Sequence, residues 1–300
     1  MSVSMATGEL VREEPLVRPV RWRLAALRHV PVVPLSIITL ILLTAVLANV
    51  LTPYSPVDIA LPERLKPPFW EQGGSLAHPL GTDPMGRDLL TRMIYGARIS
   101  LLVGFLGLCL GGGVGAALGL IAGYAGGRVD AFLMRATDTA LSFPIILFAI
   151  LLVVILGGSL LTVVLAVALV LWARFARVIR GETLSIRERD FVAQARIAGS
   201  SPMRIIVVHL FPNVLNTLVV LLSLQVGWVI IVEASLSFLG AGVPPPTPTW
   251  GSMIAEGRDY IASAWWVSFF PGLAILVTVL AFNLFGDWLR DALDPTLRQL

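Results

Sequence analysis

The chain has 300 residues, of which 56% are hydrophobic and only 14% charged, and its formal net charge is +3. Soluble domains carry about 25% charged residues, so this composition excludes an ordinary soluble globular protein. The single cysteine, Cys109, excludes a disulfide framework and a thiolate metal cluster. We therefore expect an all-α integral membrane protein with several spanning helices.

Six apolar stretches separated by turn residues predict six transmembrane helices, each needing roughly 20 residues to cross a bilayer. They cover 32–51, 99–122, 131–156, 160–173, 214–239 and 264–286. The first is interpreted as a retained helix and not a cleaved signal peptide, because no A-x-A cleavage site follows it. Pro271 predicts a kink in the sixth.

The distribution of basic residues predicts the orientation. Sixteen of the 22 fall in the two tails, in the loop between the second and third helices and in loop 174–213. The positive-inside rule then places both termini in the cytoplasm. The expected order is a cytoplasmic tail (1–31), a first helix (32–51), an extracytoplasmic segment (52–98), a five-helix core (99–289) and a cytoplasmic tail (290–300).

Within 52–98, Asp83 followed by Pro84 has the pattern of a helix N-cap and first position. The apolar residues that follow share one helical face, which predicts an amphipathic helix on the outer membrane surface.

In the second apolar stretch, glycines recur at every fourth position, which lets a neighbouring helix approach closely. They are Gly107, Gly111, Gly115, Gly119 and Gly123. We interpret this glycine stripe as ordinary helix packing.

Loop 174–213 predicts two short helices. Asp190 is placed to cap the first, 191–198, and Gly199 to end it in the left-handed conformation. Ser201 (or Ser200) is placed to cap the second, 203–211, with Pro202 at its first position. Short apolar helices must bury against something. The residues alone leave open whether this is the protein's own helix ends or a groove on a soluble partner.

Three charged residues lie inside apolar stretches. Glu233 is about twenty residues into the fifth helix, near the outer boundary, where a functional role and snorkelling to water are equally compatible with its position. Arg135 and Asp138 are predicted to pair locally at one-turn spacing.

The sequence lacks the common catalytic motifs. Its three histidines have no metal-ligand spacing, and its only lysine, Lys66, precedes Pro67, so no P-loop is present. If ATP drives this protein, another polypeptide must hydrolyse it.

The segment Ala193-Gln194-Ala195-x3-Gly199-x9-His209-x-Phe211-Pro212 resembles the EAA loop of ABC importer permeases. Further collinear stretches resemble the C-type subunit of the dipeptide/oligopeptide (nickel) permease family. They include His78-Pro79-Leu80-Gly81-Thr82-Asp83, Leu141-Ser142-Phe143-Pro144, Glu233-Ala234-Ser235-Leu236-Ser237-Phe238-Leu239-Gly240 and Gly286-Asp287-Trp288-Leu289-Arg290-Asp291.

The resemblance implies a type I ABC importer permease-like bundle in the bacterial inner membrane, forming half of a peptide path. It implies four partners besides lipid and no nucleic acid: a homologous B-type permease, two cytoplasmic ATPases that use ATP and Mg, and an extracytoplasmic substrate-binding protein. This chain itself would hold no catalytic residue, cofactor or metal.

The resemblance also implies site residues. The EAA-like loop 190–212 would contain the coupling helix, and Glu233, Ser237 and Phe238 would belong to the path or its gate. The coupling residues would be Arg189, Asp190, Phe191, Val192, Ala193, Gln194, Ala195, Arg196, Gly199, Ser201 and Pro202. Ala193 stands where the family has glutamate, so coupling would rest on apolar docking plus Arg189 or Arg196.

Alternatives remain. The same architecture could import nickel or another small solute. An ion-coupled secondary carrier would need a charged pair or a broken helix near the midplane, and a membrane hydrolase would need a nucleophile–base motif.

Overall fold

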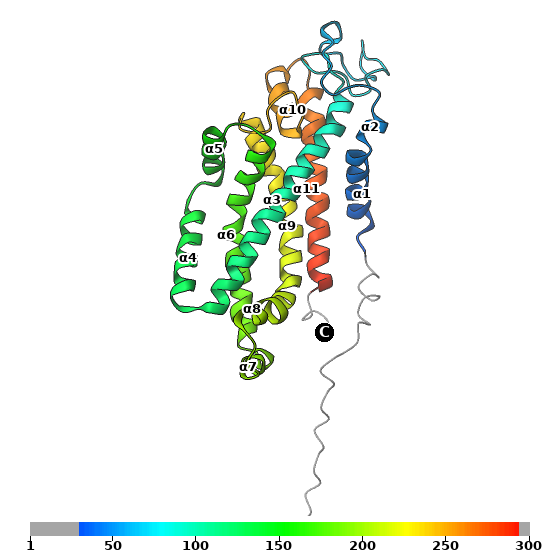
Figure 1. Cartoon of the computed structure of the whole chain (residues 1–300). Helices are drawn as coiled ribbons and strands as arrows, with labels where there is room; N and C mark the ends of the chain where they lie inside the picture. The colour runs from blue at the N-terminus through cyan, green and yellow to red at the C-terminus, as the bar shows by residue number, and fades with distance from the viewer. Residues whose placement is uncertain (1–29, 294–300) are drawn as a thin grey trace, which may run out of the picture. The chain divides into compact units, whose positions relative to one another are not determined.

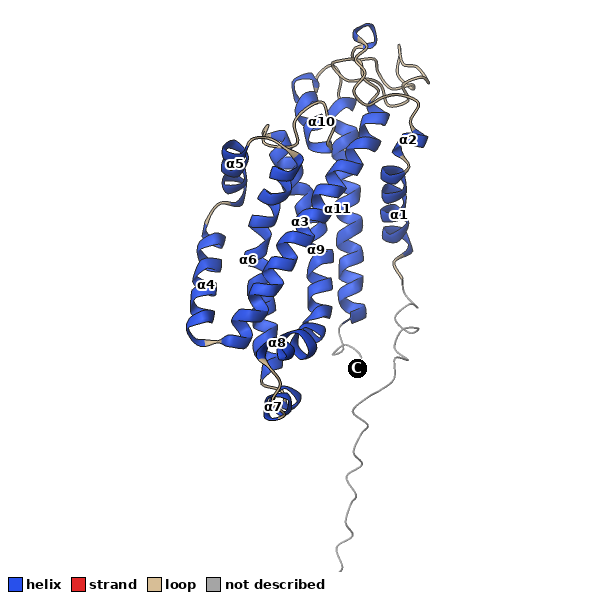
Figure 2. Cartoon of the chain, viewed as in Figure 1, coloured by secondary structure: helices blue, strands red, loops and turns tan. Residues whose placement is uncertain are grey.

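The computed structural model describes residues 30–293, which form helices and connecting loops (Figure 2). Within that range no β-strand occurs, and Thr82 and Asp88 form one isolated bridge. The predicted all-α class is confirmed. The expected tails, 1–31 and 290–300, lie outside the described residues except for their innermost few positions.

The helices follow one another as labelled in Figure 1. They are α1 (Val32–Val46), α2 (Ala48–Leu51), α3 (Leu89–Ala125), α4 (Gly127–Ser142), α5 (Ile145–Leu156), α6 (Leu160–Arg187), α7 (Asp190–Ile197), α8 (Pro202–Arg204), α9 (Phe211–Phe238), α10 (Trp250–Gly257) and α11 (Trp266–Leu293).

Four helical stretches are long and apolar enough to cross a membrane: Leu89–Ala125, Leu160–Arg187, Pro202–Phe238 and Trp266–Leu293. A bent pair, α4 with α5, makes a fifth candidate, while the 15 residues of α1 fall short of a full span. The predicted count of six is therefore not reproduced exactly.

The predicted amphipathic surface helix is wrong. Asp83 does not cap a helix; its Oδ1 accepts the backbone N–H groups of Met85 (2.7 Å) and Arg87 (3.0 Å), which closes a turn. Asp88 is the N-cap instead, because its Oδ2 accepts the Thr91 N–H at 2.8 Å. The apolar residues from Leu89 onward are thus the first turns of α3 itself.

Other predicted boundaries also change. The stretch 131–156 is broken at Phe143 and Pro144, where α4 and α5 bend by 92°, since proline cannot continue the preceding helix. α6 continues well past the predicted end at 173, so Arg174 lies within a helix and not in a loop. Pro271, where a kink is predicted, lies inside α11.

The second short helix, predicted to stop before Pro212, instead runs on. α8 passes through a π-helical turn, Ile205–Leu210, directly into α9. Pro212 follows directly on this π-helical turn, where the backbone hydrogen-bond pattern changes, and the helix continues past it. The apolar stretch therefore extends from Pro202 to Phe238.

The glycine stripe packs α3 against α6 (Figure 1), as predicted. A Cβ on Gly111 would lie 2.8 Å from the Ala168 carbonyl, and one on Gly115 only 2.3 Å from the Trp172 carbonyl. Only glycine permits this backbone approach. α9 packs beside α3 and α6, and α11 contacts α1, α9 and α10.

Candidate functional site

The connection between α6 and α9 forms one end of the bundle, here called the α7 end. α7 finishes in a Schellman arrangement: Gly199 N–H donates to the Arg196 carbonyl (3.0 Å) and Ser200 N–H to the Ala195 carbonyl (3.0 Å). Gly199 has φ +78°, which matches its predicted left-handed role. Ser201 then accepts the Arg204 N–H at 3.3 Å and caps the next helix, with Pro202 at its first position, as predicted.

Asp190 does not cap α7, contrary to prediction. Arg189, whose backbone is extended, takes the N-cap position, and Asp190 is the first helical residue. An acidic group there still stabilises the positive end of the helix dipole.

The predicted coupling residues separate into two faces of α7. Val192 and Ala195 are buried against the main apolar core, and Phe191 packs partly against the same core. The other face is open. It presents Arg189, Asp190, Ala193, Gln194, Arg196 and Ile197.

On this face Arg196 is attached to the bundle, whereas Ile197 is exposed. The Arg196 guanidinium lies over the Tyr124 ring, 5.4 Å from its centroid, which attaches α7 to the end of α3. Ile197, by contrast, is 88% exposed. A bare apolar side chain beside basic residues can dock into an apolar groove with an acidic rim.

Glu233 lies at the opposite end of the bundle, here called the α10 end, and does not snorkel to the surface. It is fully buried and accepts hydrogen bonds from Ser100 (2.9 Å) and Ser237 (2.8 Å). Thr249, which caps α10, donates to the Ser237 hydroxyl at 3.2 Å. This cluster, the Glu233 knot, joins α3, α9 and α10. Phe238 is more exposed than Glu233, and the guanidinium carbon of Arg258 lies over its ring, 5.8 Å from the centroid.

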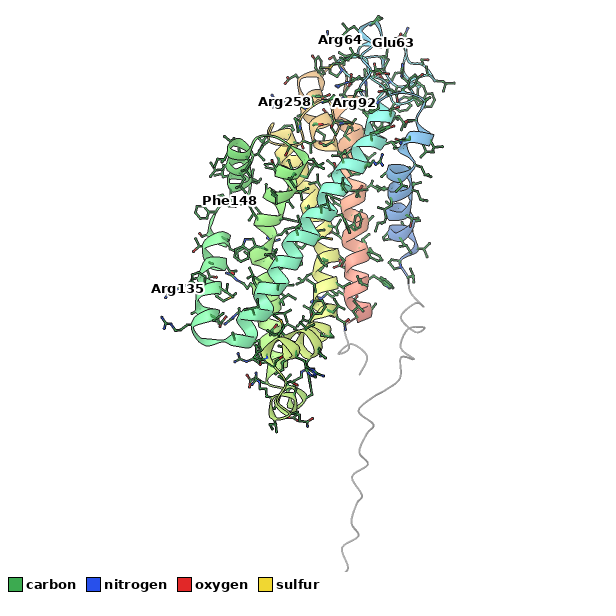
Figure 3. The ribbon with its side chains drawn as sticks, viewed as in Figure 1. Glu63, Arg64, Arg92, Arg135, Phe148 and Arg258 are labelled. Carbon is green, nitrogen blue, oxygen red and sulfur yellow. The ribbon has the colours of Figure 1, made fainter. Side chains whose placement is uncertain are left out.

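An ion cluster at the same end was missed by sequence reasoning. Arg92 Nη1 donates to Asp83 Oδ2 (2.5 Å) and Glu256 Oε2 (2.6 Å). Arg87 also donates to both acids, from Nε to Asp83 Oδ2 (2.6 Å) and from Nη2 to Glu256 Oε2 (2.7 Å). Figure 3 shows Arg92 at the top of α3. Asp83, Arg87 and Arg92 are close in sequence, but no local signal predicts the partner Glu256 on α10.

The predicted local pair of Arg135 and Asp138 does not form. Arg135 is exposed and points away from the neighbouring helices (Figure 3), while Asp138 pairs with Arg177 of α6. The Asp138 carboxylate faces α6 and is neutralised by an arginine of that helix. The spacing of Arg135 and Asp138 within one helix could not predict this partner.

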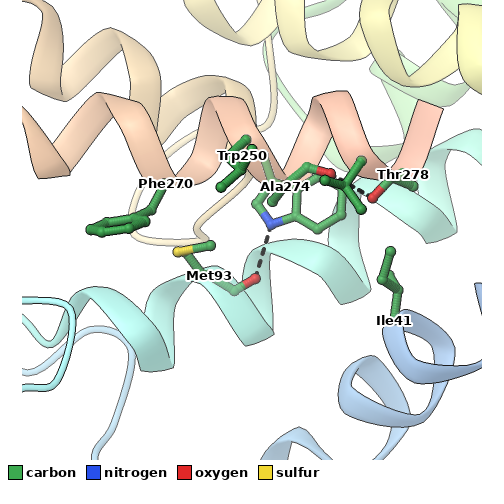
Figure 4. A pocket seen from close by; sticks show the side chains of 8 residues that line it. Ile41, Met93, Trp250, Phe270, Ala274 and Thr278 are labelled. Carbon is green, nitrogen blue, oxygen red and sulfur yellow. Dashed lines mark hydrogen bonds between the residues drawn. The ribbon is translucent and has the colours of Figure 1, made fainter. Parts of the chain in front are cut away.

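An apolar pocket of about 220 Å³ lies between α1, α3, α10 and α11 (Figure 4). Its polar atoms are already paired: Trp250 Nε1 donates to the Met93 carbonyl (3.0 Å), and Thr278 donates to the Ala274 carbonyl (2.6 Å). It therefore offers no partner to a charged ligand. In the described part of the chain no three His, Cys, Asp or Glu side chains are placed to hold a metal ion.

Comparison with known proteins identifies the family. Residues 115–299 match the model of the binding-protein-dependent transport system inner membrane component. The dipeptide transport system permease protein DppC of Escherichia coli K12 is 48% identical over 268 residues, 89% of each chain. The glutathione transport system permease protein GsiD of Pectobacterium atrosepticum is 41% identical over 98% of this chain and 97% of its own.

Solved structures agree on the fold. An inward-facing structure of the MetNI methionine ABC transporter matches with a TM-score of 0.56 and 19% identity, covering 69% of this chain and 96% of that one. A second inward-facing crystal form of the same transporter gives a TM-score of 0.54. The chain belongs to the family of binding-protein-dependent transport system inner membrane components, the membrane-spanning permease subunits of ABC importers.

Proposed function

We propose that this chain is the membrane-spanning subunit of an ATP-driven importer of short peptides. The supporting observation is 48% identity to a dipeptide permease over 89% of both chains. A second relative, of Pseudomonas aeruginosa, is named for di- and tripeptides and is 44% identical over 86% of both chains. The substrate class is therefore a peptide of two or three residues.

We assign coupling to the α7 end. One face of α7 is fixed to the bundle through Val192 and Ala195, and the other presents Ile197 and Arg189. A cytoplasmic ATPase would bind the open face, and α8, which continues into α9, would transmit its movement to the membrane. Because Ala193 carries no charge, the contact with the ATPase depends on the apolar side chain of Ile197 and on Arg189.

We assign the α10 end to the external side and the gate. The Glu233 knot holds α3, α9 and α10 together there. Phe238 and Ser237 lie beside it, so a change in the packing of α9 against α10 would open or close the path at this point. Both termini would then be cytoplasmic.

The complete importer in this proposal contains four more subunits in the bacterial inner membrane or beside it. A homologous B-type permease supplies the other half of the path, two ATPases bind ATP and Mg, and a binding protein delivers the peptide. This chain contributes no catalytic group.

The test is to purify the complex from membranes by a tag on this chain, identify its subunits by mass spectrometry and reconstitute it in liposomes. With ATP, Mg and the binding protein, the liposomes should take up ¹⁴C-labelled dialanine and not ⁶³Ni²⁺. A chain that purifies alone and takes up solute on an ion gradient without ATP would be a secondary carrier and would contradict the proposal.

A further inference from the structure

Three arginines of α6, spaced three residues apart, have different partners. Arg180 pairs with Asp130 of α4 through hydrogen bonds of 2.5 and 2.6 Å, and Arg177 pairs with Asp138 of α4. Arg174 has no carboxylate partner among residues 30–293. Its Nη1 donates to the amide oxygen of Gln225 on α9 at 3.2 Å.

The position of Arg174 along the bundle makes this unusual. It lies at the midpoint of α6, about 20 Å from either end at 1.5 Å per residue. Gln225 lies equally near the midpoint of α9. The apolar run of α6 begins at Leu160, so Arg174 lies about 20 Å into a span about 30 Å thick, closer to its α7 end. Charged residues at such depth are costly and mark the pathways of ions and substrates.

The surroundings stabilise the charge without neutralising it. The Trp228 ring lies 4.9 Å from the guanidinium carbon, a cation–π contact. Gln225 occupies one of the five guanidinium N–H donors, and the Arg174 side chain is only partly buried. A planar guanidinium with free N–H groups is shaped to bind a carboxylate through two parallel hydrogen bonds.

Arg174 lies on a different strip of α6 from the one that meets the glycine stripe. Gly111 and Gly115 of α3 contact α6 at Ala168, Leu171, Trp172 and Phe175, and the centre of this set is roughly a third of a turn around the helix from Arg174. Arg177 and Arg180 reach α4, and Arg174 reaches α9. Arg174 thus lies on the side of α6 that faces α9, and a solute passing along this side would meet its guanidinium.

We propose that Arg174, supported by Gln225 and Trp228, is an intramembrane binding site for the carboxylate of the peptide in transit. This inference rests on the proposed function. A free carboxylate is the group that linear di- and tripeptides have in common, and moving it into an apolar span without a partner is costly. One cation within the span lowers that barrier and does not select among peptide side chains.

The test measures uptake of ¹⁴C-labelled dialanine by liposomes containing the complete complex, with ATP, Mg and saturating binding protein. Arg174→Gln should lower the maximal rate about tenfold or more, the range of a charge-assisted hydrogen bond. Arg174→Lys should restore part of the rate because it keeps the charge. Arg177→Gln, one helical turn away, is the matched control and should stay near the parental rate.

Gln225→Ala separates binding from packing. It removes the hydrogen bond that Arg174 donates to the Gln225 amide oxygen of α9 but keeps the cation, so uptake should fall by about threefold at most, less than in Arg174→Gln. An equal loss in Gln225→Ala and Arg174→Gln, or no recovery in Arg174→Lys, would make Arg174 a packing residue and overturn the inference. So would parental uptake by Arg174→Gln or an equal loss in Arg177→Gln. Absence of dialanine uptake by the parental complex would instead contradict the proposed function.

Discussion

The hydroxyl group of Ser100 on α3 donates a 2.9 Å hydrogen bond to the Glu233 carboxylate on α9, across 133 residues of sequence. Ser237 donates to the other carboxylate oxygen, and Thr249 at the start of α10 donates to Ser237. Three helices therefore meet at one buried acid. Any movement of α9 relative to α3 or α10 must break or rearrange these hydrogen bonds.

Glu233→Ala should therefore destabilise the protein. It leaves the Ser100 hydroxyl buried without its acceptor and opens a cavity, for an expected loss of about 1–3 kcal/mol. The measurement is the thermal unfolding midpoint of the purified complex. Ser235→Ala is the control, since the Ser235 hydroxyl bonds only the Ile231 carbonyl of its own helix. Equal midpoints for the two variants would show that the Glu233 knot does not stabilise the α10 end.

Gly115→Leu should weaken the packing of α3 on α6. A Cβ there would lie 2.3 Å from the Trp172 carbonyl and 2.6 Å from Phe175 Cβ, so the helices must separate. Overpacking of this kind costs about 1–3 kcal/mol or more. Gly113→Leu, two residues away, is a matched control because no atom lies within 4 Å of its added Cβ. The yield of assembled complex should fall for Gly115→Leu alone; equal yields would contradict the prediction.

Local sequence signals predicted the features that depend on backbone geometry. The glycine spacing on α3, the left-handed Gly199 and the cap formed by Ser201 with Pro202 are all confirmed. Each follows from a steric or hydrogen-bonding requirement within a few residues. The apolar runs likewise predicted where helices occur, because burial of apolar surface extends over whole turns.

Contacts between distant residues could not be predicted in this way. Glu233 has the same local sequence whether it reaches water or Ser100, and only the packing of α3 on α9 decides. Asp83 resembled a helix cap, yet it accepts the Met85 and Arg87 N–H groups in a turn and pairs with Arg87 and Arg92. Arg174 was assigned to a loop because arginine usually ends an apolar span, although α6 continues beyond it.

Labelling can test the orientation of the bundle. Ser75 lies in the long loop between α2 and α3 and is exposed. In a Cys109→Ala background, Ser75→Cys should react with a membrane-impermeant maleimide on intact cells, because the positive-inside rule places this loop outside. A second variant, Ala193→Cys on α7, should react only after permeabilisation. The reverse pattern would invert the topology and place the coupling face outside.

The last prediction concerns transmission through α7. Gly199 has φ +78° and nothing within 4 Å of an added Cβ, so a substitution there acts through the backbone alone. Gly199→Val should cost about 1–2 kcal/mol of left-handed strain and misdirect α7 relative to α8. Transport and transport-coupled ATP hydrolysis should both fall, while the membrane helices still insert. Gly181→Val is the matched control, because its backbone is helical and its surroundings are equally open.

The docking contact itself requires a different variant. Ala195 was expected in the ATPase contact, but it is buried against the bundle, so a charge there would disturb folding first. Ile197 is 88% exposed on the open face of α7, and Ile197→Glu should place a charge in the apolar contact without disturbing the core. The ATPase retained on a tagged complex, measured by quantitative mass spectrometry, should fall, whereas Ile197→Leu should retain the parental amount. If Ile197→Glu retains the ATPase and both Gly199→Val and Ile197→Glu transport at the parental rate, α7 is a plain connection between α6 and α9. Coupling must then pass through another part of the α7 end.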